Sequence, residues 1–149
     1  MIGVNPLEQL ARARDASRIS AVSQLGRAID RYAVNQEGTY PAASTTWQDT
    51  LVSAGEIKGV VSAPANSFAC SAVNNQGNIC YAVGTSSYCP GTNTSIWTIL
   101  ESKLYSNKIG CSSGQYPYAI YQSFTGKIGY ICGGTYDGGV DICYPLVDL

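Results

Sequence analysis

The chain has 149 residues, an ordinary size for one domain with its own hydrophobic core. Charged residues make up 13% of it, against about 25% in a typical soluble protein, and nine basic and ten acidic residues give a net charge of −1. This balance excludes the basic surface with which most nucleic-acid-binding proteins hold phosphates. The absence of histidine excludes Ser–His and Cys–His catalytic pairs.

The first predicted element is one long helix over residues 5–35. Asn5 can cap its first turn, and Pro6 suits a position whose N–H would have no partner. Apolar side chains recur every three or four residues along its second half, as packing on a sheet requires: Ile19, Val22, Leu25, Ile29 and Tyr32. In the first half, charged side chains surround the helix: Arg12, Arg14, Asp15 and Arg18. Because about thirty residues span roughly 45 Å, we expect this half to project beyond the globule.

Three short segments along and after this helix form a combined pattern. They are residues 13–18 (Ala-Arg-Asp-Ala-Ser-Arg), residues 28–33 with an aromatic at Tyr32, and residues 38–41 (Gly-Thr-Tyr-Pro), where glycine and proline end the helix. The pattern resembles type IV pilins and pseudopilins over residues 5–41. The resemblance implies a non-enzymatic filament subunit, anchored in the membrane before assembly and extracellular afterwards. Its implied partners are other copies of itself and the pilus assembly machinery at the inner membrane.

The apolar half-helix with which pilins begin has no counterpart here. Residues 1–4 read Met-Ile-Gly-Val, and no window approaches the roughly 18 apolar residues that a membrane span needs. No secretory signal peptide is present either. We therefore expect a soluble, monomeric portion of a pilin, with residues 2–4 as the stump of the span. Glu8 does not correspond to the buried glutamate of the family, and the family's leader and cleavage site have no match.

The rest of the chain is expected to form a connection and a sheet. Residues 36–66 are predicted to be polar connection with a short helix at residues 46–54, where Trp47 and Leu51 anchor one face in the core. Within residues 67–149, apolar runs rich in β-branched and aromatic residues predict strands at 78–83, 96–100, 118–122 and 127–132, the last two joined by a turn at 124–127. We predict a single α+β domain of the pilin architecture, with the helix packed on an antiparallel meander of about four strands.

Six cysteines lie in this last part and none in the first helix: Cys70, Cys80, Cys89, Cys111, Cys132 and Cys143. No two of them have Cys-x-x-Cys spacing, so three disulfides in an oxidising compartment are a better interpretation than a metal site. Many pairings are possible. Turn residues within two short loops favour Cys70–Cys80 and Cys132–Cys143, which leaves Cys89 with Cys111.

Candidate chemistry is sparse, and each candidate has a simpler interpretation. Asp137 and Asp141 could hold calcium through carboxylate and carbonyl oxygens, or could belong to a plain Asp-Gly turn. Residues 93–95 (Asn-Thr-Ser) match the acceptor pattern for N-glycosylation, which often arises by chance. Glu101 could be a buried, perturbed carboxylate, but we expect an exposed strand position. We predict no catalytic, cofactor or metal site.

We predict a structural subunit of a type IV pilus-like filament used for adhesion, motility or DNA uptake. A pseudopilin of type II secretion is an alternative with the same fold, and a calcium measurement would separate the two. A small secreted glycan-binding or hydrolytic domain is an alternative from another class, which a pocket with clustered carboxylates would support. A sortase-assembled pilin is disfavoured, because residues 144–149 (Tyr-Pro-Leu-Val-Asp-Leu) lack its Leu-Pro-x-Thr-Gly signal.

Overall fold

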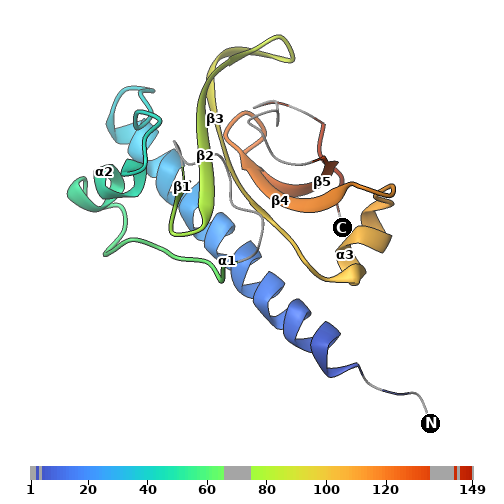
Figure 1. Ribbon diagram of the computed structural model, residues 1–149. Helices are drawn as coiled ribbons and strands as arrows, with labels where there is room; N and C mark the ends of the chain where they lie inside the picture. The colour runs from blue at the N-terminus through green and yellow to red at the C-terminus, as the bar shows by residue number, and fades with distance from the viewer. Residues whose placement is uncertain (1–2, 4, 66–74, 135–142, 144, 149) are drawn as a thin grey trace.

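The computed structural model describes residues 3, 5–65, 75–134, 143 and 145–148. This part of the chain forms a long helix packed on a five-stranded antiparallel sheet, in which each strand pairs with the next along the chain (Figure 1). The elements are α1 Pro6–Asn35, α2 Trp47–Ser53, β1 Asn75–Gln76, β2 Ile79–Ser86, β3 Cys89–Ile99, α3 Lys103–Ile109, β4 Tyr116–Gln122 and β5 Lys127–Gly133. The predicted α+β class is confirmed.

The first helix forms as its sequence predicts. The Asn5 side chain accepts hydrogen bonds from the backbone N–H groups of Leu7 and Glu8, and Pro6 occupies the first turn. The helix ends where Gly38 adopts a φ of +85°, and the Gly38 N–H donates to the carbonyl of Ala33 at 2.8 Å. The 30 residues of α1 therefore have a defined cap at each end.

The sheet differs from the predicted one in two respects. It has five strands rather than about four, because the two residues of β1 pair with β2 across a turn in which Gly77 and Asn78 both have positive φ. In addition, β3 begins at Cys89 instead of residue 96. Residues 90–95 contain proline, glycine and small polar side chains, so they lack the apolar pattern that identifies a strand in sequence.

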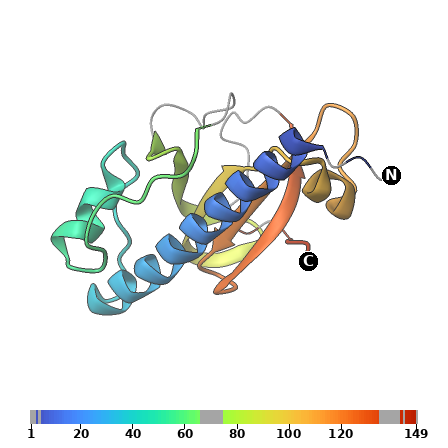
Figure 2. The same ribbon diagram turned by 90° about the horizontal axis from the view of Figure 1, so that it is seen from below.

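The main core lies between α1 and one face of the sheet, which Figure 2 shows from below. Val22, Leu25 and Ile29 are fully buried there, as predicted. Tyr32 packs against this core while only partly buried, and Ile19 is likewise only half-buried. The apolar face of the helix is thus centred on three of the five predicted residues.

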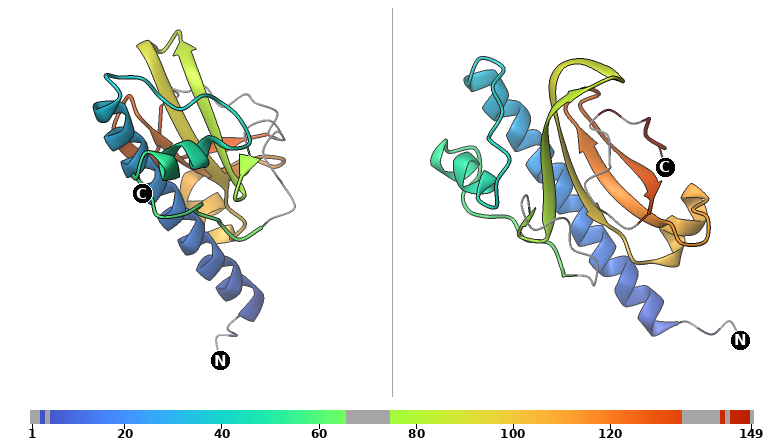
Figure 3. Two further views of the ribbon diagram at one scale, coloured as in Figure 1. Left: turned by 90° about the vertical axis from the view of Figure 1, so that its left-hand side faces the viewer. Right: turned by 45° about the horizontal axis from the view of Figure 1, so that its top comes forward.

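The short helix α2 closes one end of this core, beside the second half of α1 and the edge formed by β1 and β2 (Figure 3). Trp47 and Leu51 are fully buried, and the Trp47 ring stacks on Tyr81 with centroids 4.6 Å apart. The fully buried Gln48 side chain donates to the carbonyls of Val61 and Gln76 and accepts from the Val61 N–H. The polar connection is therefore fixed by hydrogen bonds from α2, and its predicted helix is confirmed.

The opposite face of the sheet is also buried. Since successive residues of a strand point to opposite faces, Ile96 faces α1 while Trp97 lies in a second cluster with Ile120 and Ile131. Leu146 packs against this second cluster and against Gly129, where an added Cβ would lie only 2.6 Å from the Leu146 Cβ. Both faces of the central strands are covered, which explains their nearly continuous apolar sequences.

Two of the three predicted disulfides, Cys132–Cys143 and Cys89–Cys111, are wrong. Cys89 is bonded to Cys143, and Cys111 is bonded to Cys132. Short loops favoured Cys132–Cys143, but Cys132 lies on β5 beside the end of α3, which places Cys111 within a Cα–Cα distance of 5.3 Å. Cys80 is disulfide-bonded as well, and its predicted partner, Cys70, lies outside the described residues.

Candidate functional site

The sequence predicts that the whole first half of α1 projects beyond the globule, but in the structure much of this half is covered. Leu7 and Leu10 are 76% and 55% exposed, and Figure 1 shows these turns extending past the sheet. Asp15 and Arg18, by contrast, are fully buried, and Ala11 is nearly so. Only the side of the first turns that carries Leu7 and Leu10 is exposed, because α3 and the segment before it contact the other side of this half of the helix.

Asp15 holds the start of α3. Its carboxylate accepts hydrogen bonds from the backbone N–H of Ser102 at 2.8 Å and from that of Glu101 at 3.0 Å. Ser102 is the residue before the first turn of α3, and its own side chain makes no capping hydrogen bond. In most helices, the side chain of the residue at the N-cap accepts hydrogen bonds from the free N–H groups of the first turn. At the start of α3, the carboxylate of Asp15 on α1 accepts hydrogen bonds from backbone N–H groups instead.

Glu8, two turns earlier on α1, continues this arrangement. Its carboxylate accepts from the N–H groups of Lys103 and Leu104, each at 3.3 Å, and pairs with Arg12 at 3.3 Å. Desolvation alone would raise the pKa of Glu8, but the hydrogen bonds from Lys103, Arg12 and Leu104 outweigh it and lower the pKa. Negative charge at the start of a helix is also favoured by the helix dipole.

Arg18 joins three segments at the buried end of this arrangement. Its guanidinium lies 2.8 Å from the Asp15 carboxylate and 3.2 Å from that of Glu101. It also donates to the backbone carbonyls of Pro64 and Ala65, at 3.2 and 3.0 Å. The buried positive charge of Arg18 is therefore paired with two carboxylates and hydrogen-bonded to two backbone carbonyls, as a buried charge requires.

We call Glu8, Asp15, Arg18 and Glu101 the α1–α3 clasp. Glu101 follows β3 rather than lying within it, and it pairs with both Arg14 and Arg18. The sequence singled out Glu101 but did not indicate its partners, which lie more than eighty residues earlier. The geometry of the clasp suits a structural task, because each carboxylate oxygen faces a backbone N–H or a guanidinium. It fixes the sheet at a defined position along α1.

The second end of α1 presents another exposed apolar residue. Val34 is 82% exposed and lines a hollow of about 310 Å³ together with Asp30, Arg31 and Asn35. Both ends of the helix therefore expose apolar side chains, while the middle is held by the clasp and the core.

The remaining candidates from the sequence have different outcomes. The Asn93 side chain is buried, and its amide donates to the Pro90 carbonyl at 3.0 Å, so it is not presented for glycosylation in the folded chain. Asp137 and Asp141 lie outside the described residues. Elsewhere, among the residues that the structure describes, no group of three or more metal-binding side chains is found.

The described helices contain no segment long and apolar enough to cross a membrane. Comparisons with known protein families, with curated proteins and with solved structures give no significant match.

Proposed function

We propose that this chain is the head, with the adjoining part of the long helix, of a type IV pilin-like filament subunit. The observation that carries the proposal is the position of α1: its second half is packed on the sheet, while its first turns extend past the sheet (Figure 1) and expose Leu7 and Leu10. The sequence pattern of residues 13–18, 28–33 and 38–41 adds to it.

The proposal assigns separate tasks to the two parts of the helix. In a filament of this kind, an apolar half-helix ahead of α1 would pack with neighbouring copies, and the exposed Leu7 and Leu10 would continue its apolar surface. The clasp would keep the head at a fixed position along α1, because Asp15 and Arg18 connect this helix to both α3 and residues 64–65. A fixed position is what a regular helical assembly of identical subunits requires.

The composition of the chain is compatible with this role. A net charge of −1 gives little mutual repulsion between copies, and the disulfides suit a compartment outside the cytoplasm. We expect the contacts between the heads of neighbouring copies to be too small for stable association without the apolar half-helix, since interfaces below about 1,200 Å² are weak.

The test adds what the proposal requires. The chain would be expressed with a cleavable leader and an apolar span of about 20 residues ahead of Asn5, in a host with pilus machinery. We expect leader removal, membrane insertion and filaments that antibodies against the head decorate in electron microscopy. The matched control is the chain without the span, which should remain a monomer by light scattering at high concentration. A processed, inserted chain that never enters filaments would refute the proposal, and so would ordered filaments formed by the control.

A further inference from the structure

The end of the molecule at which α1 begins presents exposed apolar and basic side chains together. Figure 1 shows the first turns of α1 and the whole of α3 at this end. The Glu8 carboxylate joins the two helices, because it accepts hydrogen bonds from the N–H groups of Lys103 and Leu104. We give the name start surface to six exposed residues: Leu7, Leu10, Arg12, Arg14, Lys103 and Lys108.

Charge is distributed unevenly between this end and the rest of the chain. The first half of α1, Glu101 and α3 contain five basic residues and three acidic ones, so their formal charge is +2. The basic residues are Arg12, Arg14, Arg18, Lys103 and Lys108, and the acidic ones are Glu8, Asp15 and Glu101. The remaining four basic and seven acidic residues of the chain have a formal charge of −3. The net charge of −1 therefore conceals an excess of positive charge beside the start of α1.

The two lysines of α3 carry this excess. Each of the three arginines is paired with one of the three carboxylates. In the part of the chain that the structure describes, neither Lys103 nor Lys108 forms an ion pair, and both are exposed. Their ammonium groups are therefore available to an anionic partner.

The same end exposes apolar surface. Leu7 and Leu10 are 76% and 55% exposed, and residues three positions apart are neighbours on the surface of a helix. Exposed leucines beside lysine and arginine are typical of helices at a membrane interface, where apolar side chains enter the acyl boundary and long basic side chains extend to the headgroups. The clasp does not explain the lysines, because it uses the backbone N–H of Lys103 and not its side chain.

We infer that the start surface binds the headgroup region of an anionic lipid membrane. Anionic headgroups attract Lys103 and Lys108 within a Debye length, about 8 Å at physiological ionic strength. Leu7 and Leu10 lose contact with water as they enter the acyl boundary, which is favourable. A nucleic acid or an acidic polysaccharide could meet the lysines but would leave the leucines in water, so a membrane accounts for both features.

This attachment is separate from filament assembly and from an apolar span ahead of α1, because the present chain carries the whole start surface. Binding of this kind is peripheral and reversible, far weaker than the insertion of a transmembrane helix. A chain that fails to bind vesicles would leave the filament proposal as it stands. A chain that binds vesicles but never enters filaments would leave this inference as it stands.

Sedimentation with lipid vesicles tests the inference on the chain as it exists. We expect the chain to sediment with vesicles of equal parts phosphatidylglycerol and phosphatidylcholine, and to stay in solution with vesicles of phosphatidylcholine alone. Raising the salt concentration from about 0.1 M to about 1 M shortens the Debye length from about 10 Å to about 3 Å, so binding should weaken about tenfold or more. A chain that binds both kinds of vesicle equally, or neither, would overturn the inference.

A matched pair of double variants tests the lysines. Lys103→Gln with Lys108→Gln should weaken binding to the anionic vesicles about tenfold or more, since each lysine near such a surface adds to the attraction. Lys58→Gln with Lys127→Gln removes the same charge from two exposed lysines outside the start surface, and this variant should bind nearly normally. Equal losses in the two variants would contradict the inference, because net charge alone would then decide binding.

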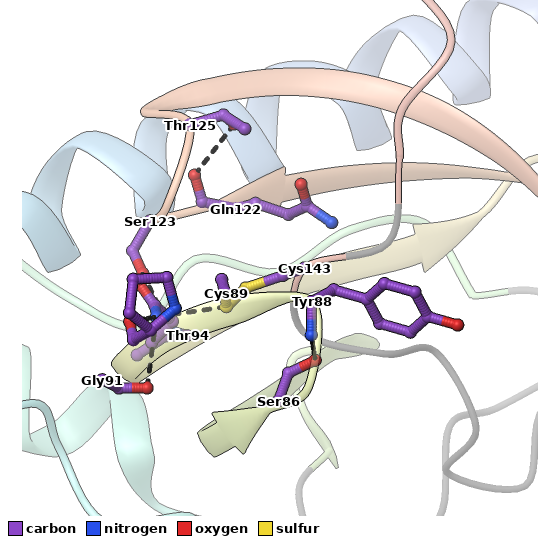
Figure 4. The surroundings of a disulfide bond; sticks show 11 residues. Ser86, Tyr88, Cys89, Gly91, Thr94, Gln122, Ser123, Thr125 and Cys143 are labelled. Atoms are coloured by element: carbon purple, nitrogen blue, oxygen red, sulfur yellow. Dashed lines mark hydrogen bonds between the residues drawn. A yellow bond between two sulfur atoms is a disulfide. The ribbon is translucent and has the colours of Figure 1, made fainter.

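Leu7→Ser tests the apolar contribution and should weaken vesicle binding about tenfold. Tyr88→Ala is its control: Tyr88 is 61% exposed, and Figure 4 shows its ring pointing away from the Cys89–Cys143 disulfide. The eleven residues of β3, which span about 35 Å, separate this turn from Glu101, so Tyr88→Ala should bind normally.

Soluble heparin distinguishes a membrane from other polyanions. Normal vesicle binding by Leu7→Ser, together with equally strong binding to heparin, would overturn the inference by identifying the start surface as a general site for anions. Circular dichroism of each variant shows whether the fold is retained, which we expect because the replaced side chains are exposed.

Discussion

Asp15 is fully buried, and its contacts explain how a charge is tolerated there. One oxygen accepts from Arg18 and from the Glu101 N–H, and the other accepts from the Ser102 N–H. Removing one member of a buried pair leaves the other charge without compensation, which is costlier than the pair is stabilising.

Asp15→Asn should therefore destabilise the fold by about 3 kcal/mol, the lower end of the range for a broken buried pair, because Glu101 still neutralises Arg18. The amide nitrogen would also face a backbone N–H that needs an acceptor. Urea unfolding measures the change. Arg12→Ala is the control: its side chain is 52% exposed, and loss of its pair with Glu8 should cost under about 1 kcal/mol. Equal losses in the two variants would mean that Asp15 is solvated.

At Gly26, α1 lies close against the sheet. An added Cβ would lie 2.5 Å from ring atoms of Tyr121, and this ring is held in place because its hydroxyl donates to Asp30. Alanine improves helix propensity by about 1 kcal/mol, but forcing a methyl group into a packed core costs about 1–3 kcal/mol. We expect Gly26→Ala to be destabilising overall in thermal unfolding, while Gln24→Ala, on the exposed side of the same turn, should change little. A stabilised Gly26→Ala variant would show that Tyr121 moves freely.

At the scale of elements, α1 is held unevenly along its length. Ile29 is fully buried whereas Leu10 is 55% exposed. Ile29→Ala should cost about 2–5 kcal/mol as a truncation in the core. Leu10→Ala should cost under about 1 kcal/mol, as exposed substitutions do. Chemical denaturation compares the two, and similar losses would mean that the first turns are docked as firmly as the core.

The third helix depends on α1 in a different way, through carboxylates. The folded-state pKa of Glu8 is lowered, so its hydrogen bonds stabilise α3 above the ordinary value of 4.5 and are lost as the pH falls through the lowered pKa. The amide proton signals of Lys103 and Leu104 should titrate below pH 4.5 in NMR spectra. Glu8→Gln should remove that transition, whereas Asp49→Asn on α2 should leave it unchanged. A transition that persists in Glu8→Gln would contradict its assignment to Glu8.

The elements that the sequence predicted are those with their own periodic pattern. The caps of α1, its buried centre at Val22, Leu25 and Ile29, and the short helix around Trp47 all follow from local spacing. By contrast, α3 has no buried residue, so no apolar face identified it, although Ser102 before it and Gly110 after it are typical helix boundaries. The clasp was not predictable, because the contacts that join α1 to Glu101 and to the start of α3 link residues more than eighty positions apart.

At the scale of the whole molecule, the disulfides connect elements that the hydrogen bonds of the sheet do not. Cys111–Cys132 ties the end of α3 to β5, and Cys89–Cys143 ties the β2–β3 hairpin to the segment that carries Leu146 and Val147. That segment protects the edge of β5, where Tyr130 and Val147 exchange two backbone hydrogen bonds, of 3.0 and 2.8 Å. Turn residues within short loops did not identify these two pairs, because the bonds follow the topology of the sheet, which brings distant segments together.

Peptide mapping under non-reducing conditions should therefore recover Cys89–Cys143 and Cys111–Cys132, and a Cys132–Cys143 peptide would contradict the fold of this region. The bonds join residues 54 and 21 positions apart, so on the chain-entropy account they stabilise by about 4 and about 3 kcal/mol. Replacing both cysteines of either pair by serine should lower the free energy of unfolding by those amounts. The Cys111–Cys132 replacement should in addition loosen α3, because it removes the bond that ties the end of this helix to β5.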